Sequence, residues 1–196
     1  MLIDFLRHGE PEGGRRYRGH GCDDPLTEKG WMQMRQAVAG QKPWSRIVSS
    51  PLIRCKAFAE SFAQQEGLPW EVREDLKEVG FGCWEGRDRA ELMADPEAGF
   101  DAFYADPVNC RPQGAEDLAD FVVRVGAVMD DLQEEYQDEH LLVVAHAGVI
   151  RAAIAHVIGL SAKGMYQVKV GNAEFTRFEL LKNKPNLLIF HGLKVL

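Results

Sequence analysis

The sequence predicts a three-layer α/β/α fold, in which helices cover both faces of a mainly parallel sheet. Short apolar runs typical of buried strands alternate with segments that have helical spacing, and this alternation favours parallel strands. The last two apolar runs follow one another without a helix, so we expect a hairpin that adds an antiparallel edge strand. A length of 196 residues suits one domain and would be cramped for two. We therefore expect a single domain over residues 1–196.

The N-terminal part predicts a strand, a long loop and a helix. Residues 1–6 are mostly apolar and predict a buried strand. The loop over residues 7–25 is rich in glycine, and a loop of this length inside a compact domain is usually functional or disordered. Thr27 is a suitable N-cap for a helix that reaches about Gly40.

A second strand and helix follow. Residues 46–49 predict a short strand, and Pro51 suits the first turn of a helix that ends near Gln65. Residues 70–73 predict a further short strand, which we expect near a sheet edge. Residues 75–87 are irregular and rich in glycine.

The middle of the chain predicts helices of very different length. Residues 88–105 predict short helices that break at Pro96, because proline cannot continue a helix. Residues 115–137 have apolar side chains at helical spacing and predict one long amphipathic helix.

The last third returns to strand and helix. Residues 140–145 give the clearest strand of the sequence, and residues 148–158 predict a helix. Residues 175–181 and 187–190 predict the terminal hairpin.

The composition narrows the class of partner and the compartment. A formal net charge of -7 disfavours a nucleic-acid binder and a membrane-surface protein, which are usually basic. No apolar run is long enough to span a membrane, and residues 1–6 are too short for the core of a signal peptide. The four cysteines lack the spacing of zinc ligands and are expected to be free thiols. We therefore expect a cytoplasmic protein.

Chemically active side chains follow the ends of four predicted strands. They are Arg7 and His8 with Gly9, then Arg54, then Glu78, and finally His146. Open α/β sheets bind their ligands at this edge. Phosphoryl transfer needs cations on the phosphoryl oxygens, a nucleophile, and an acid for the leaving group. The four segments supply one side chain for each of these roles.

The same segments carry a resemblance to a known family. The motif LRHGE at residues 6–10 is similar to the signature of the histidine phosphatase superfamily, the phosphoglycerate mutase-like proteins. Residues 49–54, 76–86 and 143–151 resemble further motifs of that family in the same order, and residues 112–117 are a looser match. The ending WEG of the second of these segments resembles the phosphatase branch, and within it the α-ribazole phosphatases.

The resemblance implies a role for each residue. His8 would be the nucleophile that becomes phosphorylated. The phosphoryl oxygens would be held by Arg7, Arg54 and His146, with Gly9 lining the same site. Glu78 would be the general acid and then the base. No metal ion and no cofactor is implied.

One departure concerns the loop that follows His8. Many members of the family have an Asn there that contacts phosphate, and this loop offers none. The contact is either lost or made by the backbone amides of Gly13 and Gly14. The loop also holds a basic cluster of substrate-contact candidates, Arg15, Arg16 and Arg18, with Tyr17 and His20 as weaker ones.

Three functions remain open at this stage. The first is a metal-independent phosphomonoesterase acting on a small phosphorylated metabolite, for which α-ribazole 5′-phosphate is one candidate. The second is a mutase of the phosphoglycerate type, and the third is an inactive module that binds a phosphorylated ligand. Glu74, Asp75 and Glu85 lie near Glu78 and could be solvated loop acids, as Glu78 itself could be. The oligomeric state is left open.

Overall fold

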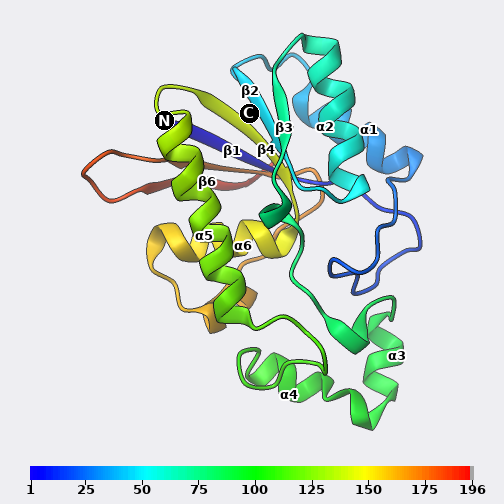
Figure 1. Cartoon of the computed structure of the whole chain (residues 1–196). Helices are drawn as coiled ribbons and strands as arrows, with labels where there is room; N and C mark the ends of the chain where they lie inside the picture. The colour runs from blue at the N-terminus through cyan, green and yellow to red at the C-terminus, as the bar shows by residue number, and fades with distance from the viewer. Residues whose placement is uncertain (195–196) are drawn as a thin grey trace.

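The computed structural model describes residues 1–194 and contains one twisted sheet (Figure 1). The strand order is β3-β2-β4-β1-β5-β6. Strands β1 to β4 run parallel to one another, whereas β5 and β6 are antiparallel to their neighbours. The expected mainly parallel sheet with an antiparallel edge is therefore confirmed. The strands are Leu2–Arg7 (β1), Arg46–Ser49 (β2), Trp70–Val72 (β3), His140–Ala145 (β4), Phe175–Glu179 (β5) and Leu187–Leu193 (β6).

Helices cover both faces of this sheet, as the three-layer prediction requires (Figure 1). Helices α1 and α2 share one buried apolar cluster with the sheet, and α5 and α6 share the other. Two short helices, α3 and α4, lie outside the layers, at the lower end of the view in Figure 1. The helices are Glu28–Val38 (α1), Ile53–Glu66 (α2), Arg89–Ala94 (α3), Phe100–Ala105 (α4), Leu118–Glu135 (α5) and Ala147–Ile158 (α6).

The central strand β4 is apolar from Leu141 to Ala145 because both of its faces are buried. In β4, Leu141 and Val143 belong to the cluster beneath α5 and α6. Their neighbours Leu142 and Val144 belong to the opposite cluster beneath α1 and α2. Successive side chains of a strand point to opposite faces, so a central strand between two helical layers needs an unbroken apolar run.

Side-chain caps decide where two of the helices begin. The Thr27 side chain accepts a hydrogen bond from the Gly30 amide, which confirms the predicted cap of α1. Helix α5 begins at Leu118 rather than at residue 115, because the Asp117 carboxylate accepts hydrogen bonds from two amides of its first turn. Helix α2 has no side-chain cap and begins at Ile53, so Pro51 precedes its first turn instead of lying in it.

The loop after β1 is joined to the segment that contains α3 and α4. The Tyr17 amide donates to the Arg87 carbonyl at 2.9 Å, and the Gly86 amide donates to the Tyr17 carbonyl at 2.7 Å. The hydroxyls of Tyr17 and Tyr104 are 2.5 Å apart. These contacts hold two segments that are distant in sequence beside the carboxyl ends of the parallel strands.

Among residues 1–194, none of the helices has the length and apolar character that crossing a bilayer requires.

Candidate active site

The ends of the parallel strands bring the expected side chains to one pocket. His8 follows β1, Arg54 lies in the first turn of α2, and Glu78 lies in the loop after β3. These three residues and Arg7 line a pocket of about 250 Å³. His146 comes directly after β4 and is fully buried, so it lies behind the pocket rather than in its lining.

The His8 imidazole is buried and held in one tautomer. Its Nδ1 lies 2.7 Å from the Gly9 carbonyl oxygen. A carbonyl oxygen can only accept a hydrogen bond, so Nδ1 carries the proton and Nε2 keeps its lone pair. Burial, together with the positive charges of Arg7 and Arg54, lowers the pKa of His8 well below its usual value. The ring is therefore a neutral base with a free nitrogen at neutral pH.

Gly9 allows the loop after β1 to touch the start of α1. A Cβ at this position would lie 2.2 Å from the Gly30 carbonyl oxygen, a distance that no side chain tolerates. A Cβ at Gly30 would in turn lie 2.1 Å from the Glu10 carbonyl oxygen. The two glycines therefore permit a close backbone contact that fixes the position of His8.

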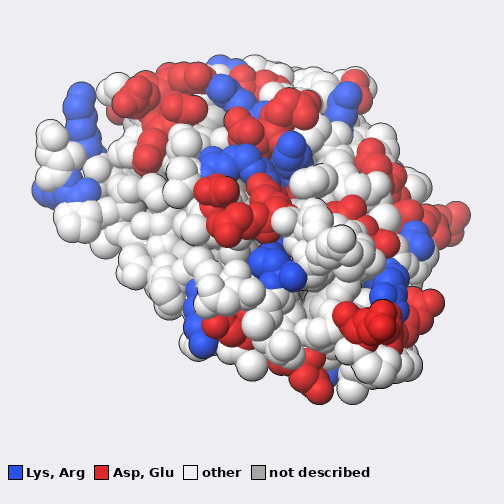
Figure 2. Space-filling model, turned by 60° about the horizontal axis from the view of Figure 1, so that its bottom comes forward, with Lys and Arg blue, Asp and Glu red and all other residues white. Residues whose placement is uncertain are grey.

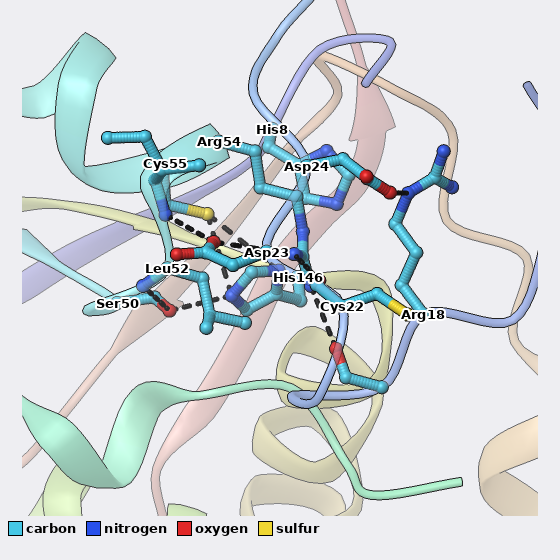
Figure 3. A network of polar contacts seen from close by, with 12 residues as sticks. His8, Arg18, Cys22, Asp23, Asp24, Ser50, Leu52, Arg54, Cys55 and His146 are labelled. Atoms are coloured by element: carbon cyan, nitrogen blue, oxygen red, sulfur yellow. Dashed lines mark hydrogen bonds and ion pairs between the residues drawn. The ribbon is translucent and has the colours of Figure 1, made fainter. Parts of the chain in front are cut away.

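The buried Arg54 and the partly buried Arg7 stand beside the His8 ring. The Arg54 guanidinium donates to the carbonyls of Cys22 and Gly19, at 2.8 and 2.9 Å, and is 1% exposed (Figure 3). Arg7 donates from one terminal nitrogen to the Val170 carbonyl at 2.8 Å. The Nε atoms of both side chains are buried and have no hydrogen-bond partner within residues 1–194. The Nε atoms of Arg16 and Arg46 also lack a hydrogen-bond partner in this range, and Arg46 lies outside the pocket. The unsatisfied donors therefore favour an anion site only together with the position of Arg7 and Arg54 in the pocket with His8.

Arg7 remains a cation in this environment. Burial lowers its pKa from 12.5 to about 10, with the nearby charge of Glu78 acting in the opposite direction. A guanidinium with this pKa is still protonated at neutral pH.

Glu78 is oriented by two backbone amides. Its Oε1 accepts a hydrogen bond from the Val79 amide at 3.0 Å, and its Oε2 accepts one from the Gly148 amide at 3.2 Å. Gly148 lies in the first turn of α6, where amides lack partners within the helix. The start of α6 thus places the carboxyl group at the pocket that contains His8.

His146 packs against His8 and is itself held by Ser50. The ring centroids of the two histidines are 5.2 Å apart in an edge-to-face arrangement. The Ser50 hydroxyl lies 2.6 Å from His146 Nε2, and the Cys55 thiol lies 3.6 Å from the same atom (Figure 3). Burial and the charge of Arg54 lower the pKa of His146 well below its usual value.

The basic cluster in the loop after β1 divides into two kinds of residue. Arg16 and Arg18 both bind the Asp24 carboxylate, and Arg18 also donates to the carbonyls of Glu12 and Gly14. Both arginines line the pocket with His8, but Arg15 does not. The donors of Arg18 are thus used in hydrogen bonds within the loop, which hold its shape.

The other residues expected in this loop have different positions. Tyr17 lines the pocket, whereas the His20 ring contacts the Glu78 carbonyl. Neither Gly13 nor Gly14 is among the residues that line the pocket with His8.

Five lining residues received no role from the sequence, namely Gly19, Phe81, Tyr104, Arg151 and Tyr166. Arg151 lies on α6 and donates to the Val168 carbonyl, and its guanidinium lies 5.6 Å from the centre of the Tyr166 ring. Phe81 and Tyr104 complete the wall with Tyr166. The sequence offered one signal for Arg151. It is a basic residue five positions after His146, on the helix that follows this histidine. The aromatic residues carry no such signal, because most aromatic side chains belong to a core.

Comparison with known proteins agrees with this geometry. The sequence model of the histidine phosphatase superfamily (branch 1) matches residues 3–191. The adenosylcobalamin/alpha-ribazole phosphatases of Salmonella typhimurium and Escherichia coli K12 are 26% and 29% identical over 196 residues, covering 98% of this chain and 96% of each relative. The crystal structure of the alpha-ribazole phosphatase from Shigella flexneri has a TM-score of 0.86 at 26% identity, covering 100% of this chain and 98% of that one. The motifs, the fold and these matches agree, and the chain belongs to the histidine phosphatase superfamily, branch 1.

Proposed function

We propose that this phosphatase hydrolyses small phosphomonoesters through a phosphohistidine at His8. One observation carries the proposal. A neutral imidazole with a free Nε2 stands beside two guanidiniums, Arg7 and Arg54, whose buried Nε donors have no partner within residues 1–194. A phosphoryl group would satisfy those donors while it presents its phosphorus atom to the nitrogen.

The reaction then has two balanced steps. In the first, His8 Nε2 attacks phosphorus, the bond to the ester oxygen breaks, and Glu78 donates its proton to the departing alcohol. In the second, Glu78 takes a proton from water, the oxygen attacks phosphorus, and the phosphorus–nitrogen bond breaks. Inorganic phosphate leaves and the neutral imidazole returns. The charge on the phosphoryl oxygens is balanced throughout by Arg7 and Arg54.

His146 has a supporting role in this proposal. The Ser50 oxygen accepts a hydrogen bond from the Leu52 amide at 3.3 Å, so its own hydrogen can go to His146 Nε2. The proton of the neutral ring then remains on Nδ1. This Nδ1 lies 3.8 Å from the Cys55 sulfur, and we assign its N–H to a phosphoryl oxygen that enters the pocket beside the His8 ring.

The relatives suggest the first compounds to test. Two of them are named as adenosylcobalamin/alpha-ribazole phosphatases, so α-ribazole 5′-phosphate belongs in any substrate panel. We also propose a cytoplasmic location, which the four free cysteines support because thiols stay reduced in that compartment. No metal or cofactor is needed for the steps assigned above.

Release of phosphate from p-nitrophenyl phosphate tests the proposal. We expect EDTA-treated protein to turn the ester over, and His8→Ala to lose at least roughly a thousandfold in kcat because the nucleophile is gone. Acid-labile, base-stable ³²P labelling of the wild type during turnover, absent from His8→Ala, would identify the phosphohistidine. Absence of turnover on every phosphomonoester of a broad panel would refute the phosphatase. Phosphoglycerate isomerisation faster than phosphate release would replace it by a mutase.

A further inference from the structure

A second pocket adjoins the one that contains His8. It has a volume of about 500 Å³ and shares four lining residues with the first pocket, Arg7, Arg16, Tyr17 and Arg18. Its remaining wall includes Glu10, Arg15, Arg89 and Asn172. A ligand whose phosphoryl group lies against His8 can therefore extend past the loop after β1 into this second space.

Three of the six charged residues that line the second pocket have an ion-pair partner. The Glu10 carboxylate, the one acidic group in its wall, binds the Lys29 ammonium at 2.7 Å. Arg16 and Arg18 share the Asp24 carboxylate. The carboxylates of Glu10 and Asp24 therefore already have basic partners. Neither is paired with Arg15 or Arg89.

Apart from Arg7, which donates to the Val170 carbonyl, two guanidiniums in this wall have no acidic partner. Arg15 makes no hydrogen bond or ion pair with any residue in the described range 1–194. Arg89 contacts the Met93 sulfur at 3.5 Å and lies 5.5 Å from the centre of the Phe100 ring, without a carboxylate. Figure 2 shows acidic and basic side chains interspersed on one face of the molecule, which carries a net charge of -7. Arg15 and Arg89 thus place two positive charges without a carboxylate partner beside the reaction pocket of an acidic protein.

We propose that Arg15 and Arg89 bind a second anionic group, a carboxylate or phosphate, on the leaving group of the substrate. The inference rests on the proposed function and narrows its substrate class to phosphomonoesters that carry a second anion. Guanidiniums match both groups, since their planar N–H donors can meet two oxygens at once. The shared wall of the two pockets is the reason to place both anions on one molecule.

Matched pairs of esters test the second anion site. Each alkyl monophosphate with a chain of two to six carbons is compared with the α,ω-bisphosphate and with the ω-carboxyalkyl phosphate of the same length. We expect the dianionic partner to have a roughly five- to tenfold higher kcat/KM at the best length, the effect of one or two charge-assisted contacts at an exposed site. Raising the salt concentration should reduce this ratio.

The ratio should disappear in the double variant Arg15→Gln, Arg89→Gln. Arg35→Gln is the matched control, because Arg35 is also exposed and also lies 5.5 Å from an aromatic ring, that of Trp31, but lines neither pocket. It should keep the ratio of the wild type. A wild-type ratio near one at every length, or a ratio that persists in the double variant, overturns the inference.

Binding separates this inference from the phosphatase proposal. Calorimetric titration of the His8→Ala protein with propane-1,3-diol bisphosphate and with propyl phosphate requires no turnover. Tighter binding of the bisphosphate that is lost in the Arg15→Gln, Arg89→Gln background supports the second site. Equal affinities for the two ligands overturn it. Absence of hydrolysis with any ester would refute the phosphatase alone and would leave the titration to decide the second site.

Discussion

The charge state of His8 follows from its surroundings. Burial removes the water that would stabilise an imidazolium, and Arg7 and Arg54 add two positive charges beside the ring. The Gly9 carbonyl then fixes the remaining proton on Nδ1. The same features that leave the Nε2 lone pair free also impose a cost on the folded state at acidic pH, because the unfolded chain can protonate this histidine and the folded chain cannot.

Protein stability should therefore depend on pH through His8. Its folded pKa lies well below 6.5, so the unfolded state binds more protons below pH 6.5 and stability falls as the pH drops through that value. The maximal slope is about 1.4 kcal/mol per pH unit for each such group. We expect His8→Asn to lose roughly 1–2 kcal/mol less stability than the wild type between pH 7.5 and 5.0. Urea unfolding in phosphate-free buffer at both pH values measures the difference.

Cys55, which is buried in the same region, provides a control for this pH dependence. Cys55 does not gain a proton in this range, since burial raises the pKa of its thiol. Cys55→Ser should therefore leave the pH dependence of the unfolding free energy as it is in the wild type, whatever it does to the absolute value. Equal pH slopes for wild type and His8→Asn would contradict the buried neutral state of His8.

Among the elements, the start of α6 determines where Glu78 lies. The Gly148 amide donates to the carboxylate, and a Cβ at Gly148 would lie 2.2 Å from Glu78 Oε1. The helix thus both binds the carboxyl group and leaves the space that it occupies. A glycine inside a helix usually lowers stability by roughly 1 kcal/mol relative to alanine, so its presence here has a local steric reason.

Gly148→Ala should displace the Glu78 carboxylate without harming the helix. We expect kcat/KM for an alkyl phosphate, whose leaving group needs a proton, to fall by at least roughly tenfold. The loss with p-nitrophenyl phosphate should be smaller, because that leaving group departs readily as an anion. Steady-state kinetics on both esters, with thermal unfolding to verify the fold, measure the effect.

Glu78→Gln provides the comparison for this variant. It keeps the shape of the side chain and removes the acid, so it should show the same preference for activated esters. Equal losses on both esters in Glu78→Gln would indicate another proton donor. Unchanged kinetics in Gly148→Ala would show that the carboxylate does not depend on the contact with α6.

Across the whole molecule, the buried Asp4 joins elements that are far apart in sequence. Its carboxylate lies in β1 and accepts hydrogen bonds from Trp44 Nε1 at 2.8 Å and from two nitrogens of Arg177 in β5, at 2.6 and 2.8 Å. His140 at the start of β4 lies 2.9 Å away through Nε2. Although burial raises it, the hydrogen bonds from Arg177, His140 and Trp44 hold the pKa of Asp4 below its usual value. The network ties the three neighbouring strands β4, β1 and β5 at the end away from the site.

Asp4→Asn should destabilise the whole fold. Removing one partner of a buried pair leaves the other without compensation and costs about 3–5 kcal/mol, and we expect the lower end because Arg177 is 23% exposed. Since the folded pKa of Asp4 is lowered, this contribution is present above pH 3.8 and is lost as the pH falls through the folded pKa. Urea unfolding at pH 7 measures the loss.

Glu139→Gln is the matched control for Asp4→Asn. It removes the carboxylate of the partly exposed pair between Glu139 and Arg46, and such pairs contribute about 1 kcal/mol or less. A loss for Asp4→Asn no larger than that of this control would contradict the structural role of the network.

Much of the fold could be predicted because its signals are local. The unbroken apolar run at residues 141–145 is a property of the strand itself, and the Thr27 cap needs only the next three residues. The boundary of α5 was misplaced because Asp117 acts through its side-chain geometry, which the apolar spacing does not register. Short segments such as η4, Ala162–Gln167, have too few residues to show a period.

The sequence by itself determined the family, the α/β architecture and the set of side chains at the strand ends, because each depends on residues close together in a motif or a period. Their catalytic roles stay a prediction. Only the tertiary structure decided which arginines have an acidic partner. Arg16 and Arg18 form ion pairs with Asp24, whereas Arg15 and Arg89 have no acidic partner within residues 1–194. The same holds for the aromatic wall and for Arg151. Pairing of charges depends on distances of a few ångströms between segments that are tens of residues apart, and no local pattern encodes those distances.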